Sequence, residues 1–170
     1  MSEASGVVIS GLYGSGKSTV VEEIADLLEE AAAPYGALDL DWLWWFDVPE
    51  YSRGEALRVL FDNLTAVADT YLDVGVTRFV MAWSLRDMSD LASLRAALRF
   101  PVQVVELNVP LRMIEARLGA AVTAGRNADL REARRWYHEG LGTGLGDVQV
   151  RNDGPIRDVA VEILTWLGWL

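Results

Sequence analysis

The chain has 170 residues, 51% of them hydrophobic, and a formal net charge of −10. This length predicts one domain with a sizeable core, and the apolar composition excludes a disordered chain. The acidic balance argues against a nucleic-acid-binding protein, because such proteins present basic surfaces to phosphates. With no cysteine and one histidine, His138, the chain lacks the residues for disulfides and for Cys- or His-rich zinc sites.

The segment Gly11-Leu-Tyr-Gly-Ser-Gly-Lys-Ser18 matches the pattern G-x-x-x-x-G-K-[ST], the Walker A motif or phosphate-binding P-loop. Residues 6–10 before it predict a short buried strand, and the hydrophobic residues after Ser18 recur at helical spacing. A strand, a glycine-rich turn and a helix in this order can surround phosphates with backbone amides. The alternative is a glycine-rich turn with a chance Lys-Ser pair, which the intact flanks disfavour.

Each position of this motif has an expected role in binding ATP. The glycines have no Cβ, so the backbone can approach the phosphates closely. We expect Lys17 to contact the β- and γ-phosphates and the hydroxyl of Ser18 to ligate Mg²⁺. The predicted ATP-binding residues of this segment are Gly11, Gly14, Ser15, Gly16, Lys17, Ser18 and Thr19.

A short second strand is predicted over 37–41, and it ends in two acidic residues. Asp39 and Asp41 alternate, so on a strand both carboxylates would face the same way. Near the P-loop they could hold Mg²⁺ through water or accept a proton from a substrate hydroxyl. We expect Asp41, farther past the strand end, to be the base and Asp39 to be linked to the metal. The alternative is a helix N-cap.

Aromatic residues follow these acids, where an acceptor substrate would lie. Trp42, Trp44 and Trp45 could wall a substrate, or they could fill the core or a dimer contact. Trp136 is interpreted as a packing residue. Ser84 and Arg86 could contact the acceptor, although Arg86 could equally pair with Asp87 or Asp90.

The rest of the chain alternates between helical and strand patterns. Helices are predicted over 55–73, 87–98, 110–122, 129–139 and 156–170, and strands over 78–83, 102–108 and 148–151. This alternation favours a three-layer α/β/α fold, with about five parallel strands and helices on both faces. Ligands of such folds bind at the carboxyl ends of the strands. No repeat or linker interrupts the chain, so residues 1–170 are predicted to form a single domain.

Arginines gather late in this acidic chain, at 126, 131, 134 and 135. Forked guanidinium groups suit phosphate, and phosphoryl transfer needs added positive charge. We therefore expect at least one of these arginines to contact a phosphate. The alternative is a solvated helix face paired with Asp129 and Glu132.

Together, the P-loop, the strand order and the later arginines resemble the small P-loop kinases of the nucleoside-monophosphate-kinase-like group. Shikimate kinase, gluconate kinase, adenylylsulfate kinase and chloramphenicol phosphotransferase are members. The resemblance covers nearly the whole chain, and the P-loop is its specific motif. It implies transfer of the γ-phosphate of ATP, with Mg²⁺, to a small-molecule acceptor.

The resemblance also assigns residues outside the P-loop. It places Arg117 and the loop with Asn152 and Asp153 against the adenine, and a lid arginine, best matched by Arg126, on the phosphates. The lid spans about 120–146. The predicted catalytic residues are then Lys17, Asp41 and Arg126, and the predicted metal ligands are Ser18 and Asp39.

One departure leaves the second magnesium partner open. The third strand ends Ala82-Trp83-Ser84, where a Walker B strand ends in an acid. The missing acid permits a binding-only P-loop protein as an alternative function. A regulatory NTPase is a second alternative, although the DxxG and NKxD motifs of GTPase switches are absent from the sequence.

The first residues are polar and contain no signal peptide, and no apolar run is long enough to cross a bilayer. We therefore expect a cytoplasmic protein, monomeric or homodimeric, without membrane or nucleic-acid partners.

Overall fold

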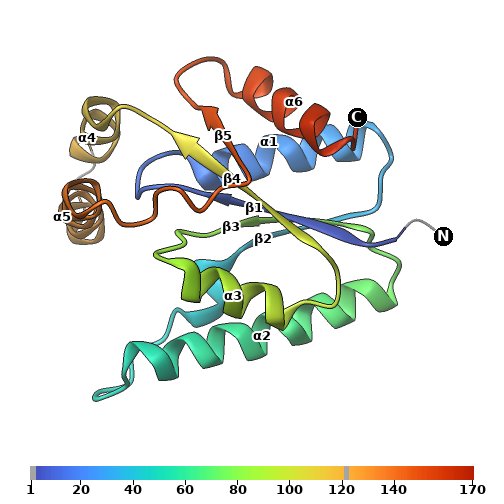
Figure 1. Ribbon diagram of the computed structural model, residues 1–170, viewed down its shortest axis with the longest axis horizontal. Helices are drawn as coiled ribbons and strands as arrows, with labels where there is room; N and C mark the ends of the chain where they lie inside the picture. The colour runs from blue at the N-terminus through green and yellow to red at the C-terminus, as the bar shows by residue number, and fades with distance from the viewer. Residues whose placement is uncertain (1–2, 121–122) are drawn as a thin grey trace.

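The computed structural model describes residues 3–120 and 123–170 and is built around a five-stranded parallel sheet (Figure 1). The strand order is β2-β3-β1-β4-β5, and every neighbouring pair is parallel. The strands are β1 (Ser5–Ser10), β2 (Tyr35–Asp39), β3 (Arg78–Ala82), β4 (Val102–Asn108) and β5 (Val148–Arg151). The predicted α/β fold with a five-stranded parallel sheet is confirmed.

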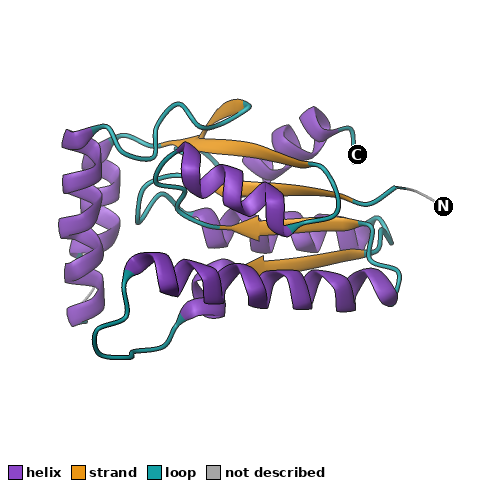
Figure 2. Ribbon diagram, turned by 60° about the horizontal axis from the view of Figure 1, so that its bottom comes forward, coloured by secondary structure: helices purple, strands orange, loops and turns teal. Residues whose placement is uncertain are grey.

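Helices cover both faces of this sheet. Two helices, α1 and α6, lie on one face and two, α2 and α3, on the other (Figures 1 and 2). The last pair, α4 and α5, pack together beyond the carboxyl ends of the strands, on the left in Figure 1. The bounds are α1 (Lys17–Glu30), η1 (a 3₁₀ helix, Leu40–Trp44), α2 (Arg53–Asp73), α3 (Met88–Ala97), α4 (Leu111–Gly119), α5 (Ala124–Glu139) and α6 (Ile156–Leu167).

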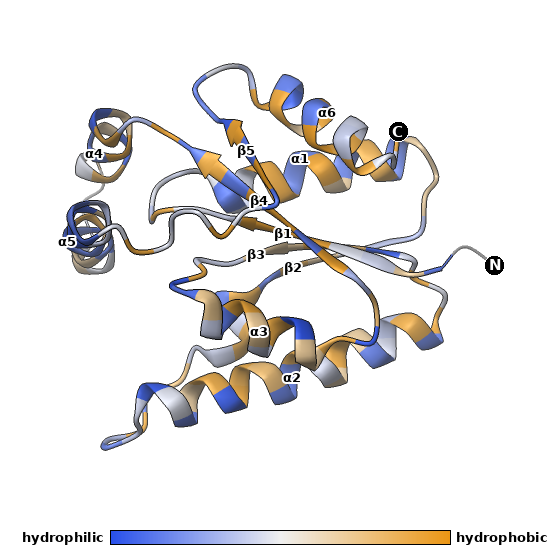
Figure 3. Cartoon of the chain, viewed as in Figure 1, coloured by the Kyte–Doolittle hydropathy of each residue, from blue (hydrophilic) through white to orange (hydrophobic). Residues whose placement is uncertain are grey.

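The central strand β1 divides the core into two layers. Val7 and Ile9 pack with α1 and α6, whereas Val8 packs with α2 and α3, because successive side chains of a strand point to opposite faces. All three are fully buried. Figure 3 shows the same division, with hydrophobic residues on the strands and on the helix faces toward them. Within the described residues, no helix is long and apolar enough to cross a membrane.

The helix α5 is longer than predicted. It begins at Ala124, so the helix start predicted at residue 129 is wrong. Thr123 is the reason, because its side chain accepts a hydrogen bond from the amide of Arg126 and caps the helix start. Extending the helix toward its N-terminus places Arg126 in its first turn.

The second strand is also shifted from its predicted position. It runs over Tyr35–Asp39, and Asp41 lies in η1 instead of on the strand. Leu40 is fully buried, which turns the chain inward immediately after Asp39. Asp39 then caps η1 by accepting a hydrogen bond from the amide of Asp41 at 3.1 Å. The two carboxylates are therefore not related by strand alternation, although both remain at the carboxyl edge of the sheet.

The register of the sheet brings the ends of three strands level. Asp39 of β2 lies opposite Ala82 of β3, and Ala82 lies opposite Ile9 of β1. The P-loop follows β1 directly. The segments that follow Asp39 and Ala82 therefore lie beside the P-loop, at the edge where ligands of parallel sheets bind.

Candidate active site

The P-loop adopts a conformation that only glycine tolerates at two of its positions. Gly14 and Gly16 have φ angles of +78° and +91°. A Cβ on Gly14 would lie 2.7 Å from Leu118 Cγ, and one on Gly16 would lie 2.7 Å from Asn152 Nδ2. No side chain caps the start of α1. The first amides of α1 are therefore available to an anion, in the arrangement that helix N-termini use to bind phosphate.

Lys17 is folded back onto this loop. Its Nζ donates to the carbonyl oxygens of Gly11 at 3.2 Å and Leu12 at 2.9 Å, and it lies 5.6 Å from the centre of the Tyr13 ring. Burial lowers the pKa of Lys17 from 10.5 to about 8, against the opposing attraction of Asp41 and nearby carboxylates. Phosphate oxygens would stabilise the ammonium better than these neutral carbonyls.

Ser18 and Asp39, the predicted metal ligands, lie in contact. The Ser18 hydroxyl donates to Asp39 Oδ2 at 2.7 Å, even though 21 residues separate them. A hydroxyl and a carboxylate are ligands that suit Mg²⁺, which is typically held by one or two protein oxygens plus phosphates and water. The described residues contain no cluster of three or more acidic or histidine side chains that could hold a metal alone. The pair therefore fits a nucleotide-bound magnesium ion.

Arg117 and Asn152 cross-link the P-loop to the end of the sheet. Arg117 donates to the carbonyls of Ser15 at 3.2 Å and Asn152 at 3.1 Å, and Asn152 Nδ2 donates to Ser15 at 2.7 Å. Both residues thus lie against the P-loop. The resemblance predicts that they border the adenine. Asp153 behaves differently, because its carboxylate is paired with Arg151.

A cavity of about 310 Å³ opens directly over the P-loop. Arg126, predicted to contact phosphate, reaches it from the first turn of α5. Arg134 is instead paired with Glu115 of α4 at 2.7 Å, and Arg135 is paired with Glu132, as the alternative of a paired helix face expects for Arg135. The lining residues are Tyr13, Gly14, Gly16, Lys17, Ser18, Thr19, Asp41, Arg117, Leu118, Arg126 and Asp129.

A second cavity of about 220 Å³ adjoins the first. Asp41 and Tyr13 line both, so Asp41 stands between the P-loop and this second space. Burial raises the pKa of Asp41, and the nearby Asp39 carboxylate raises it further. The lining residues are Tyr13, Asp41, Trp44, Arg53, Trp83, Ser84, Arg86, Glu132, Arg135 and Trp136. Below, we call this space the acceptor cavity.

The aromatic residues around Asp41 divide into two groups. Trp44 lines the acceptor cavity, packs edge-on against Trp83, and directs its Nε1 at Asp41 Oδ1 at 3.4 Å. Trp42 and Trp45 are 70% and 73% exposed, and their ring centres lie 4.8 Å apart. Trp44 is therefore the one of the three that fits the predicted substrate wall.

Several lining residues were not among the predicted site residues. Trp136 was interpreted as packing, and it does pack on Tyr13 at 5.5 Å between ring centres, but it also lines the acceptor cavity. Tyr13 occupies a variable position of the motif, and Arg53 begins a helix distant in sequence. Asp129 could have been found, because it lies three residues after Arg126 and shares its helix face.

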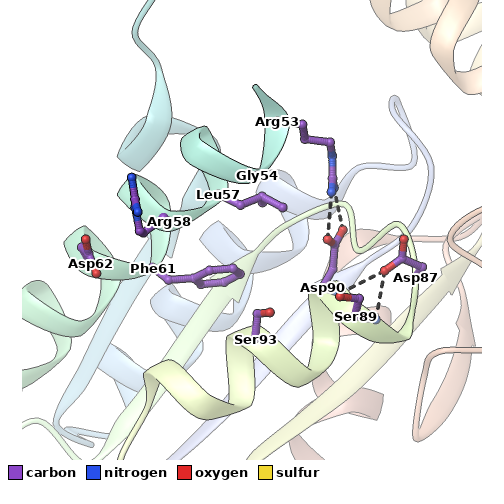
Figure 4. Close-up of a pocket in the computed structure, with 10 residues that line it drawn as sticks. All are labelled: Arg53, Gly54, Leu57, Arg58, Phe61, Asp62, Asp87, Ser89, Asp90 and Ser93. Atoms are coloured by element: carbon purple, nitrogen blue, oxygen red, sulfur yellow. Dashed lines mark hydrogen bonds and ion pairs between the residues drawn. The ribbon is translucent and has the colours of Figure 1, made fainter. Parts of the chain in front are cut away.

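A larger cavity of about 450 Å³ lies elsewhere, between α2 and α3 (Figure 4). Leu57 and Phe61 of α2 face it, and its lining contains no P-loop residue. Arg53 lines both this groove and the acceptor cavity, and it is paired with the buried Asp90 at 2.8 Å. Volume alone does not locate chemistry, and the two smaller cavities contain the phosphate-binding loop and the perturbed Lys17 and Asp41.

No protein-family model matches this chain, and no curated protein matches it either. Solved structures do resemble it over almost its full length. The APS kinase of Mycobacterium tuberculosis, solved with AMPPNP and APS, is 23% identical, covers 99% of both chains and has a TM-score of 0.69. A sugar kinase from Janibacter sp. is 22% identical, covers 97% of this chain and 95% of its own, and has the same TM-score.

The tunicamycin resistance protein of Deinococcus radiodurans is a third similar structure, with 16% identity, a TM-score of 0.66 and coverage of 98% of this chain and 96% of its own. At such low identities the likeness shows the fold. The chain has the fold of the small P-loop kinases, as the sequence predicts.

Proposed function

We propose that this protein is an ATP-dependent phosphotransferase that moves the γ-phosphoryl group to a hydroxyl of a small molecule. The observation that carries this proposal is the position of Asp41, which lines both the P-loop cavity and the acceptor cavity. A carboxylate between a phosphate-binding loop and a second small cavity is where a base for phosphoryl transfer has to be.

The transfer balances with these groups. The acceptor hydroxyl gives its proton to Asp41, its oxygen bonds to the γ-phosphorus, and the bond from that phosphorus to the bridging oxygen breaks, releasing ADP. The raised pKa of Asp41 makes its ionised carboxylate a better proton acceptor. Lys17 and Arg126 stabilise the charge on the phosphoryl oxygens.

The remaining predicted residues position the nucleotide. Arg117, Asn152 and Asp153 are proposed to border the adenine, beside the P-loop residues. Ser18 and Asp39 would hold Mg²⁺, which supplies positive charge to the phosphate oxygens when bound. We retain one domain over 1–170 with a lid over about 120–146, of which 121–122 lie outside the described residues. A cytoplasmic location, where ATP and Mg²⁺ are available, is part of the same proposal, as is a monomer or homodimer.

The test is ADP release measured across a panel of metabolites, nucleosides and antibiotics. Strong stimulation by an acceptor is expected, and Asp41→Asn should lower turnover roughly 10²–10⁴-fold with little change in ATP affinity. Asp87→Asn is the matched control, because Asp87 caps α3 and lies outside both site cavities. Full turnover in Asp41→Asn together with its loss in Asp87→Asn would show that the base has been misassigned.

The same assay separates the alternative functions. A binding-only protein would bind ATP without turnover in the presence of any acceptor. A regulatory NTPase would prefer guanine nucleotides or respond to a macromolecular partner. Either result would replace the phosphotransferase proposal.

A further inference from the structure

We infer that the ligand of the acceptor cavity is a compact molecule bearing an oxyanion group, namely a carboxylate, phosphate or sulfate, and that Arg86 binds this group with Ser84 and Trp136. This inference rests on the proposed function in one respect, namely that the ligand is called the acceptor of the phosphoryl group. The binding of an oxyanion is inferred from the side chains that line the cavity.

The first observation is a pair of unsatisfied donors. Ser84 and Trp136 are 6% and 5% exposed, and both line the acceptor cavity. Within the described part of the chain, Ser84 Oγ and Trp136 Nε1 have no hydrogen-bond partner. Leaving a buried polar group unpaired costs about 1–3 kcal/mol, and native proteins rarely do so without a reason. An indole N–H can only donate, so the partner of Trp136 must supply an acceptor atom.

The second observation is the free guanidinium of Arg86. The two nearby carboxylates that could neutralise it are already occupied. Asp90 accepts two hydrogen bonds from Arg53, at 3.1 and 2.8 Å, and one from the backbone amide of Arg86. Asp87 accepts from the amides of Ser89 and Asp90 at the start of α3. The half-buried Arg86 side chain has no ion pair or hydrogen bond among the described residues.

The acids of the cavity do not cancel this positive charge. Glu132 is paired with Arg135 at 2.6 Å. Asp41 faces the P-loop cavity as well, where Lys17 lies. The lining of the cavity thus contains three unused donors and also a carboxylate that can accept a hydroxyl proton. A ligand that carries both an oxyanion and a hydroxyl group suits this combination.

A backbone hydrogen bond also fixes the position of Arg86. Its carbonyl accepts a hydrogen bond from the amide of Gly142 at 3.0 Å, which ties the loop after β3 to the segment after α5. A Cβ on Gly142 would lie 2.9 Å from the carbonyl oxygen of Leu85, so the approach requires glycine. The cavity volume of about 220 Å³ suits a small compound.

The test uses protein labelled with ¹⁵N at the tryptophan indoles, with the Trp136 resonance assigned from Trp136→Phe. Glycerate and glycerol 3-phosphate are the anionic probes, and glycerol is the neutral control. Both anions should shift the Trp136 Nε1–H resonance, and the tighter of the two distinguishes a carboxylate from a phosphate site. Glycerol should leave it unchanged.

Removal of Arg86 is the decisive variant. Arg86→Gln should weaken the binding of the anion roughly ten- to hundred-fold, the usual worth of a charge-assisted hydrogen bond. Arg99→Gln removes the same charge from an exposed pair with Asp69 and should bind as the wild type does. No shift with either anion, or equal affinity in Arg86→Gln and wild type, would overturn the inference.

A second readout keeps this inference separate from the proposed function. In the ADP-release assay, a hydroxy acid should be phosphorylated far better than its amide. Turnover of neutral acceptors with no preference for anions would overturn the inference and leave the phosphotransferase intact. An anion-dependent shift of Trp136 without turnover of any acceptor would leave the oxyanion site standing and refute the phosphotransferase.

Discussion

ATP binding should be linked to protonation of Lys17. Without nucleotide, the ammonium is buried against neutral carbonyls, and its pKa is lowered to about 8. Bound phosphates would stabilise the charged form and raise the pKa again. Nucleotide therefore binds the protonated form preferentially, and binding at alkaline pH must take up a proton from solution.

The magnitude follows from the pKa of about 8. If the bound ammonium titrates at or above its ordinary pKa, uptake is about 0.5 proton per ATP at pH 8 and about 0.9 at pH 9. Affinity should fall about tenfold between pH 7 and pH 9. Without nucleotide, the folded protein holds fewer protons than the unfolded chain between about pH 8 and 10.5. The contribution of Lys17 to the free energy of unfolding therefore rises across that window and is least favourable below it.

Calorimetric titration in two buffers of different ionisation enthalpy measures the uptake directly. Lys17→Gln provides the control, because its weaker residual binding should show no proton uptake over the same range. Proton uptake that is zero at pH 8–9 in the wild type, together with an affinity that does not depend on pH, would refute the reasoning. It would mean that the ammonium is fully charged before ATP arrives.

Three further predictions test other parts of the site. Arg117→Ala should raise the KM for ATP more than that for the acceptor, and a nucleotide-bound structure with the base far from Arg117 and Asn152 would contradict it. Gly14→Ala should lower the free energy of unfolding in urea by about 1–3 kcal/mol, since its Cβ meets Leu118; Gly144→Ala, with a similar φ of +72° but open space, should cost less. Amide exchange over 120–146 should slow when ATP and acceptor are added, and unchanged exchange would argue against a lid.

The parts of the site that were predictable are those that local chemistry determines. The P-loop could be predicted because its glycines, lysine and serine follow one another, and the starts of α2 and α3 have capping residues in sequence. The acceptor cavity was predicted only in part. Asp41, Trp44, Ser84 and Arg86 were expected near an acceptor and do line it, whereas Tyr13, Arg53 and Trp136 were not expected there, because five separate segments contribute to the cavity. Which of their side chains meet depends on how α2 and α5 pack. The shift of β2 has a simpler cause, since a buried Leu40 was not distinguishable from a strand residue by pattern alone.

Under the proposed function, Asp39 takes the place of the missing Walker B acid. Asp39 lies on β2, two strands away from the P-loop strand, yet its carboxylate reaches Ser18 at 2.7 Å. The strand between them ends in Ala82, level with Asp39, and the bulky Trp83 that follows is buried against Trp44 and Phe61. The segment after β3 holds Ser84 where a Walker B acid would be expected. Ser84 lines the acceptor cavity, and Arg86, two residues later, lines it as well. The segment that departs from the Walker B pattern thus supplies two of the polar residues that line the acceptor cavity.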